Sequence, residues 1–153
     1  MPGDSLRPEG DYSECLEIGT LCGSLILNED IINSGFNPIE VCDDIDGDLD
    51  VLMTALCKED GPLNQNNGGY LENVLYIHEF ELSQKYTDPD LIHRIIRELP
   101  WICKRIYHVR PELLAYCISS FISKAEESKM RGFYEYDGFC SLDESHVMYA
   151  YTE

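Results

Sequence analysis

The segment Val74-Leu75-Tyr76-Ile77-His78-Glu79-Phe80-Glu81-Leu82 decides the fold of this chain. Its first four residues are all apolar or aromatic, whereas polar and apolar side chains alternate in its second half. A continuous apolar run that turns into an alternating one is typical of a strand that is buried at its start and has one polar face at its end. We therefore expect a central β-strand over residues 74–82.

A helix is expected soon after this strand. Asp88 suits the N-cap of a helix and Pro89 suits its first helical position. Apolar residues then recur at the spacing of a core-facing stripe, at Leu91, Ile92, Ile95, Ile96 and Leu99. Pro100 predicts that this helix stops or kinks there.

The remaining elements are expected to alternate between strands and helices. We expect strands over 15–27, 113–119 and 146–152, a short helical turn within 28–37, helices over 45–58 and 120–130, and a loop over 58–70. This pattern predicts an α/β (α+β) fold. Residues 1–13, which are rich in Pro, Gly, Asp and Ser, are expected to form a flexible N-terminal arm, and residues 14–153 a single domain.

Negative charge dominates the first half of the chain. The net charge is −18, and residues 1–72 hold 16 acidic but only 2 basic residues. Such a surface repels nucleic-acid phosphate and anionic lipid and attracts cations or basic protein surfaces. We therefore expect no direct binding of nucleic acid and no association with a membrane. The alternative explanation is that the charge serves solubility alone.

The seven cysteines indicate a reducing compartment. Their number is odd, they contain no C-x-x-C pair, and most of them lie in apolar segments. These features favour buried free thiols over a disulfide framework. No apolar run approaches the ~20 residues that a membrane-spanning helix needs. We expect the protein to be cytoplasmic.

No metal site is expected from the spacing of potential ligands. Residues 43–50 alternate aspartates in the manner of a calcium loop, but a loop that starts at Asp44 has Leu49 at its sixth and Ala55 at its twelfth position. A calcium loop needs Gly and a bidentate acid there. These aspartates fit a solvated loop or a helix N-terminus better. The four histidines share no metal-ligand spacing, and no G-x-S-x-G nucleophile elbow is present.

The C-terminal half resembles a known superfamily. The strand 74–82 and the residues from Ser83 to Leu99 look like the central strand, cofactor loop and helix of GNAT acyltransferases. Residues 133–139, Phe-Tyr-Glu-Tyr-Asp-Gly-Phe, and the segment 146–149 are similar to that superfamily's F-Y-x-x-x-G-F stretch and final strand. The resemblance covers about residues 71–153. It implies a mixed, mostly antiparallel sheet that is flanked by helices and splayed beside the central strand.

The same resemblance implies an activity and catalytic residues. The expected activity is an acetyl-CoA-dependent N-acyltransferase that acts on an amine or basic substrate. Glu79 or Glu81 would act as the general base for the amine, and Tyr134 would protonate the departing thiolate. Without catalysis, the two glutamates would form a polar strand face and Tyr134 would be a half-buried core aromatic residue.

The cofactor loop departs from the family pattern. The resemblance implies cofactor-binding positions at Phe80, Leu82, Thr87, Asp88, Asp90 and Ile92. The family's loop reads (R/Q)-x-x-G-x-(G/A), and its backbone N–H groups hold the pyrophosphate. Here the matching residues are Thr87, Asp90 and Ile92, with Asp88 also in place of a frequent glycine and Pro89 lacking an N–H. Two carboxylates therefore stand where a polyanion must approach.

Two hypotheses follow from these observations. In the first, the chain is an acyltransferase and binds acetyl-CoA measurably. In the second, it is a catalytically inactive GNAT-like binding or regulatory protein, a pseudoenzyme whose acidic half engages a basic protein partner. The second predicts salt-sensitive association and no cofactor. The sequence does not determine the oligomeric state or the identity of the substrate or partner.

Overall fold

The computed structural model describes residues 15–86, 88–117, 131–132, 135, 138–142 and 146–152. Its strands are β1 (Gly19–Ile26), β2 (Val74–Leu82), β3 (Leu113–Cys117), β4 (Cys140–Ser141) and β5 (Val147–Tyr151). Its helices are α2 (Asn28–Asn33), α3 (Pro38–Ile45), α4 (Gly47–Leu56) and α5 (Pro89–Tyr107). The fold is a mixed α and β structure, as the sequence predicts.

The described strands form one five-stranded sheet in the order β1-β2-β3-β5-β4. The pairs β1/β2, β3/β5 and β4/β5 are antiparallel, and β2 and β3 are parallel. A parallel pair needs a crossover connection, which α5 supplies. The prediction of a mixed, mostly antiparallel sheet flanked by helices is confirmed, and β2 has the bounds expected from the sequence.

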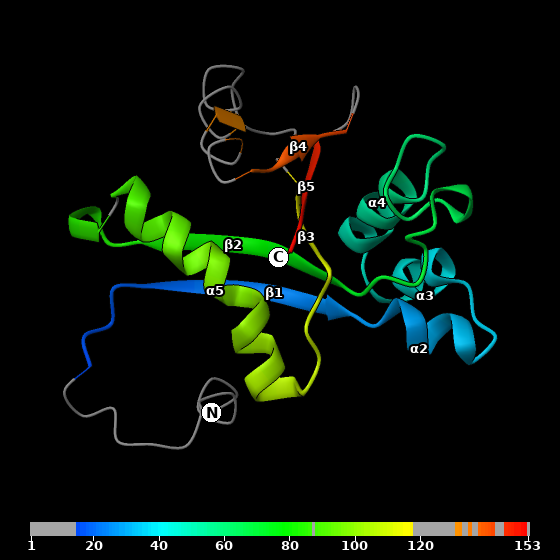
Figure 1. Ribbon diagram of the computed structural model, residues 1–153, viewed down its shortest axis with the longest axis horizontal. Coiled ribbons are helices and arrows are strands. Elements are labelled where there is room, and N and C mark those ends of the chain that lie inside the picture. The colour runs from blue at the N-terminus through cyan, green and yellow to red at the C-terminus, as the bar shows by residue number, and fades with distance from the viewer. Residues whose placement is uncertain are drawn as a thin grey trace.

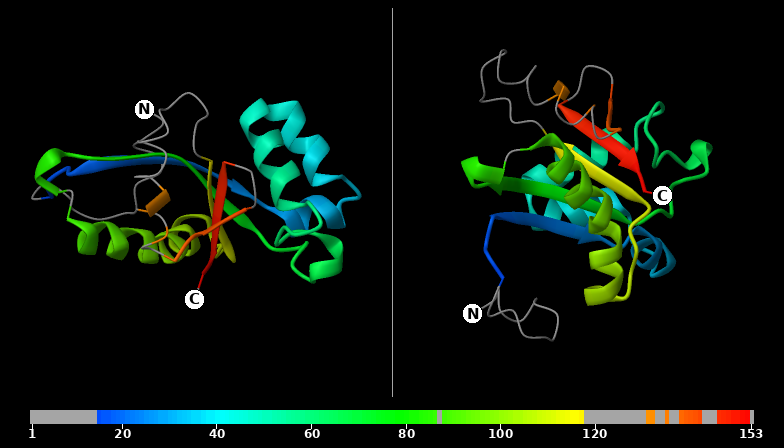
Figure 2. Two further views of the ribbon diagram at one scale, coloured as in Figure 1. Left: turned by 90° about the horizontal axis from the view of Figure 1, so that it is seen from above. Right: turned by 60° about the vertical axis from the view of Figure 1, so that its left-hand side comes forward.

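Helices cover both faces of the sheet (Figure 1). The left view of Figure 2 shows α5 on one side of β1 and β2 and the helices α3 and α4 on the other. The alternation of side chains along β2 explains this arrangement, because successive residues of a strand point to opposite faces. Val74 and Tyr76 pack in the core beneath α2–α4, and Leu75 and Ile77 pack in the core beneath α5.

The helix expected around 45–58 corresponds to α4, which begins two residues later and ends two residues earlier. The structure has two helices, α3 and α4, that meet at Asp46. Asp46 adopts an extended backbone with φ of −160°, and its Oδ1 accepts a hydrogen bond from the Asp48 backbone N–H at 2.9 Å. An aspartate that caps a helix in this way ends the preceding helix because its own φ/ψ is not helical. The aspartates of 43–50 therefore include a helix cap, one of the two alternatives to a calcium loop.

Of the stop or kink expected at Pro100, the stop is wrong. Helix α5 runs through this residue to Tyr107, with Pro100 inside it. Proline lacks the N–H for one helical hydrogen bond and costs ~3 kcal/mol in a helix interior. Leu99 and Cys103, on either side of the proline, are buried against the sheet. Tertiary packing therefore continues the helix where local propensity predicts its end.

Several expected features fall outside the described residues. These are the N-terminal arm over 1–13, the helix over 120–130, and the site residues Thr87 and Tyr134. The loop over 58–70 is described, and a short 3-10 helix, Gln65–Asn67, is its regular part.

The expectation that the cysteines are buried free thiols is confirmed only in part. All seven are free, but Cys15, Cys22 and Cys140 are exposed. Cys42 is buried, and burial, with smaller contributions from Cys57 and Asp50, raises the pKa of its thiol to about 11. Burial also raises the pKa of the Cys57, Cys103 and Cys117 thiols. These four thiols are therefore mainly protonated at neutral pH, which lowers their nucleophilicity.

Candidate functional site

The carboxyl half of β2 contains a β-bulge at His78. In the register with β1, Cys22 is opposite Glu79 and Gly23 is opposite Ile77, so His78 is an extra residue in β2. A bulge of this kind shifts the alternation of side chains by one position. Ile77 faces α5 before the bulge, and Phe80 and Leu82 face α5 after it.

The bulge brings His78 next to two neighbours. Its Nε2 lies 2.7 Å from the Ser24 Oγ, within hydrogen-bond distance, and its ring centroid lies 4.2 Å from that of Tyr76. The buried Tyr76 hydroxyl has a raised pKa, chiefly because of burial. Neither His78 nor Ser24 was predicted from the sequence as a site residue. The signal was present, since apolar residues fall at 75 and 77 and then at 80 and 82, which breaks the period of two by one residue.

Glu79 and Glu81 lie on the exposed face of the sheet. Both side chains are exposed, and they pair across the strands with Cys22 and Thr20, which are also exposed. The two glutamates therefore form a polar strand face, as the alternative to a catalytic role predicts. This face is also open to a substrate, so their position is compatible with both hypotheses.

The strands β2 and β3 diverge beside this face. Their parallel pairing runs from Val74 and Leu113 to Ile77 and Tyr116. Figure 1 shows β2 and β3 starting side by side and separating toward their carboxyl ends. The bulge follows directly after the last paired residue of β2, and bulges increase the local twist of a strand.

The N-terminus of α5 is capped by its own aspartate. The Asp88 Oδ1 accepts a hydrogen bond from the Asp90 backbone N–H at 3.1 Å, and the Asp88 carbonyl accepts one from the Ile92 N–H at 3.1 Å. Pro89 has no N–H. Asp88 and Asp90 are exposed, so their charges stand at the helix end. Of the first three helical positions, only Leu91 has a backbone N–H that these contacts leave available to an anion.

The other expected cofactor-binding residues belong to the core. Ile92 is a buried residue of α5, and Phe80 and Leu82 are half-buried and pack against the same cluster. Their side chains support the packing of α5 on β2. The structure therefore brings Glu79 and Glu81 together on one face, and Phe80, Leu82 and Ile92 together on the other. Thr87 and Tyr134 lie outside the described residues.

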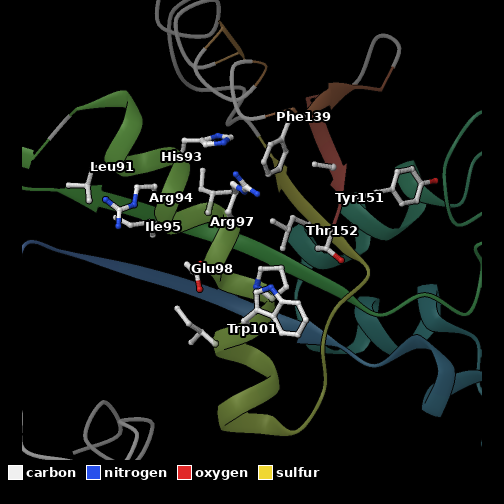
Figure 3. A pocket seen from close by; sticks show the side chains of 15 residues that line it. Leu91, His93, Arg94, Ile95, Arg97, Glu98, Trp101, Phe139, Tyr151 and Thr152 are labelled. Atoms are coloured by element: carbon white, nitrogen blue, oxygen red, sulfur yellow. The ribbon is translucent and has the colours of Figure 1, made fainter.

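A cavity of about 890 Å³ lies between α5 and β5. Figure 3 shows His93 and Arg97 extending from α5 toward Phe139, and Trp101 and Thr152 also line this cavity. His93 and Arg97 already make interactions of their own. Sequence analysis missed this cavity. The basic character of its α5 wall is visible in the sequence, because residues 94–110 hold five of the 11 basic residues and one acid.

The described part of the chain contains neither a candidate metal site nor a membrane-spanning helix. Within it, no three His, Cys, Asp or Glu side chains are placed so that they could hold a metal ion. The helices described there also include none that is both long and apolar enough to cross a membrane.

Comparisons with known proteins do not identify the chain. No protein-family model matches it, and neither does any curated protein or any solved structure. Its function is therefore inferred from its own residues and geometry.

Proposed function

We propose that this chain is a GNAT-like domain that has lost acyl-CoA binding and binds a basic protein surface through the acidic layer of α2, α3 and α4. The observation that carries the proposal is the capped N-terminus of α5. The sheet order, the parallel pair β2/β3 and the crossover by α5 support the GNAT-like part, because they fit the splayed mixed sheet that the resemblance implies.

The cap at α5 opposes a pyrophosphate in two ways. The donor that a phosphate oxygen would use on Asp90 is taken by the Asp88 carboxylate, and Pro89 offers none. The carboxylates of Asp88 and Asp90 also repel a polyanion. At ~4–5 Å and an effective dielectric constant near 20, each contact between like charges costs on the order of a few kcal/mol before screening by salt.

The layer of α2–α4 supplies the proposed binding surface. Residues 28–56 contain eight acidic residues and no Lys, Arg or His. Seven of these acids are exposed, as are the apolar side chains of Phe36, Ile45 and Val51. Exposed acids with apolar groups among them fit a partner that presents Lys and Arg around an apolar centre. We place the protein in the cytoplasm, which its seven free cysteines support.

The first test is isothermal titration with acetyl-CoA at low and moderate salt. We expect no heat of binding from the folded wild-type protein up to millimolar ligand. Micromolar binding would contradict the loss of the cofactor and would favour acyltransferase activity.

The second test locates the partner surface. The chain is used as bait for proteins of its own cell at about 50 and 300 mM salt, since screening weakens exposed charge pairs. We expect the triple variant Asp43→Asn, Asp44→Asn, Asp48→Asn to lose the salt-sensitive partner. The matched control Glu17→Gln, Glu79→Gln, Glu81→Gln removes the same charge and should retain it. Equal loss in both variants would contradict a specific surface.

A second candidate function is the N-acyltransferase itself, with acetyl-CoA as the cofactor and an amine or basic substrate. The observation that favours it is the exposed pair Glu79 and Glu81 beside the divergence of β2 and β3. His78, at 2.7 Å from the Ser24 Oγ, is a further base on this face. In this case the acidic layer would attract the amine, and Tyr134 would serve as the acid. Transfer of an acetyl group to a test amine by the purified protein would establish it.

A further inference from the structure

A second cavity lies within the layer of α2–α4, away from the face of Glu79 and Glu81. Its volume is about 510 Å³, and its walls come from α2, α3, α4 and the loop over 58–70. Met53 and Leu63 give it buried apolar walls, and Phe36 and Tyr70 give it aromatic ones. These helices pack at the Val74 end of β2, whereas the two glutamates lie at the other end (Figure 1).

Asn28, one of the residues that line this cavity, has a buried side-chain acceptor. Its side chain is 0% exposed and lines the cavity, and its Nδ2 donates a hydrogen bond to the Glu72 carbonyl at 2.9 Å. That bond fixes the orientation of the amide, so the Oδ1 is the atom that remains. Within the described part of the chain, the Asn28 Oδ1 has no hydrogen-bond partner. A buried acceptor without a partner costs ~1–3 kcal/mol, which a donor in the cavity would relieve.

The loop wall of the cavity is held in place by asparagine side chains. The Asn64 Nδ2 donates to the Cys57 carbonyl at 3.1 Å, and the Asn64 Oδ1 accepts from the Asn66 N–H at 2.9 Å. The Asn67 Nδ2 donates to the Gly61 carbonyl at 2.7 Å. These bonds tie the loop to the end of α4 and to itself. The cavity is therefore formed before any ligand enters, which reduces the entropy that binding costs.

The negative charge around the cavity favours a positively charged ligand. Residues 28–70, which provide its entire described lining, hold ten acidic residues and one lysine. The field of this segment attracts a cation and repels an anion. Aromatic rings such as those of Phe36 and Tyr70 add to this attraction, because their faces stabilise ammonium groups.

We propose that this cavity binds a small primary ammonium compound that carries an apolar group. The ammonium N–H groups meet the need of the Asn28 Oδ1 for a donor and the negative sign of the field. The apolar group packs against Met53 and Leu63. The proposal does not depend on the fate of acyl-CoA, since the N-terminus of α5 is not part of this cavity. The cavity shares Phe36 with the proposed partner surface, but the test below uses a small molecule and needs no protein partner.

The test uses three probes that share a phenylethyl group, on the full-length protein. These are 2-phenylethylammonium, its N,N,N-trimethyl analogue, which has the charge but no N–H, and 2-phenylethanol, which has the O–H but no charge. Binding is followed by amide shifts in two-dimensional NMR spectra. We expect 2-phenylethylammonium to bind with a dissociation constant on the order of 1 mM. The other two should bind about tenfold more weakly. For every probe that binds, the amide shifts should be confined to residues 28–39 and 53–70.

Variants separate the acceptor from the field. Asn28→Ala should weaken binding of 2-phenylethylammonium about tenfold if the variant folds, as loss of the N–H groups does in the trimethyl analogue. Because that residue also holds the Glu72 carbonyl, a second variant is needed, and the exposed rim residue Gln65 provides it. Gln65→Lys should weaken binding of the ammonium about threefold through its added positive charge. Ser83→Lys adds the same charge at an exposed position beyond the other end of β2 and should leave binding unchanged.

Two outcomes would overturn the proposal. One is the absence of shifts in residues 28–39 and 53–70 with all three probes, in which case a buried water satisfies the Asn28 Oδ1. The other is equal binding of all three probes, which would indicate apolar contact alone.

Discussion

The two helical layers of this protein both bury apolar side chains against one sheet, but they differ in the number, length and charge of their helices. On one face, the single helix α5 has 19 residues, with four basic and two acidic side chains. On the other face, α2, α3 and α4 have 6, 8 and 10 residues and no basic side chain. Each layer covers alternate residues of β2. The difference shows that burial against the sheet requires apolar residues on the inner surface of each layer. The charge of the outer surface is not constrained in this way and can serve binding or solubility.

The largest expected effect tests whether both layers belong to one cooperative core. Leu52 of α4 is 0% exposed, and Ile96 of α5 is 4% exposed. Leu52→Ala and Ile96→Ala should each lower the free energy of unfolding by about 2–5 kcal/mol, because both leave a cavity. Chemical denaturation measures this loss. The control Val51→Ala, at a residue 57% exposed on α4, should change it by less than about 0.5 kcal/mol. A Leu52→Ala protein of unchanged stability would mean that the short helices are an appendage.

The next effect compares the two aspartate-capped helix ends as barriers to a phosphate. Asp88→Gly with Asp90→Gly should raise the affinity for acetyl-CoA at least about tenfold, because it removes two like charges from the α5 terminus. Isothermal titration gives the affinity. The same change in the other layer, Asp46→Gly with Asp48→Gly, serves as the control and should have no effect. If the α5 variant gains nothing, charge is not the obstacle at this loop.

The two N-terminal caps should contribute similar free energies to the stability of the fold. The Asp46 Oδ1 accepts from the Asp48 N–H at 2.9 Å, and the Asp88 Oδ1 accepts from the Asp90 N–H at 3.1 Å. Asp46→Ala and Asp88→Ala should each cost about 1 kcal/mol of stability, measured by urea denaturation. Replacement by Asn keeps the acceptor and should restore most of the loss. A much smaller loss for Asp88→Ala would show that the longer helix does not depend on its cap.

The smallest effect concerns the loop that enters β2 from the acidic layer. Burial, and then the nearby charge of Glu112, raises the pKa of Glu72. A raised pKa in the folded state means that Glu72 favours folding below its unfolded pKa and loses this contribution as pH rises through the folded value. Glu72→Gln should therefore raise the melting temperature at pH 7, by on the order of 1–2 °C after screening by solvent, and by less at pH 4. Thermal melts at the two pH values measure the difference, and an equal change at both would contradict this assignment.

The sequence predicts the elements that have strong local signals. The apolar run of 74–82 predicts β2 with its correct bounds, and Asp88 with Pro89 predicts the start of α5. Helix ends inside acidic or proline-containing segments are predicted less well. Asp46 separates the expected helix α4 from α3, which was not predicted, because a cap residue with extended φ/ψ stops one helix where the next begins.

The candidate site was only partly predictable. Glu79 and Glu81 were expected on a polar strand face and lie on one. The contact of His78 with Ser24 was not expected, because it joins residues 54 positions apart across a bulge. The bulge itself has a local signal in the shifted apolar period at 77–80, but the partner strand does not. The cavity beside Asn28 combines helices and a loop, so no single segment predicts it.

By itself, the sequence determined the central strand, the capped helix after it, the mixed class of the fold and the acidity of the first half. These properties depend on the order of neighbouring residues and on their charge, which a chain carries whether or not it is folded. Only the tertiary structure decided that α5 continues through Pro100, that His78 meets Ser24, and that Asn28 is left with a buried acceptor at a cavity. These depend on contacts between distant segments, whose packing energy exceeds local propensity and is absent until the chain folds.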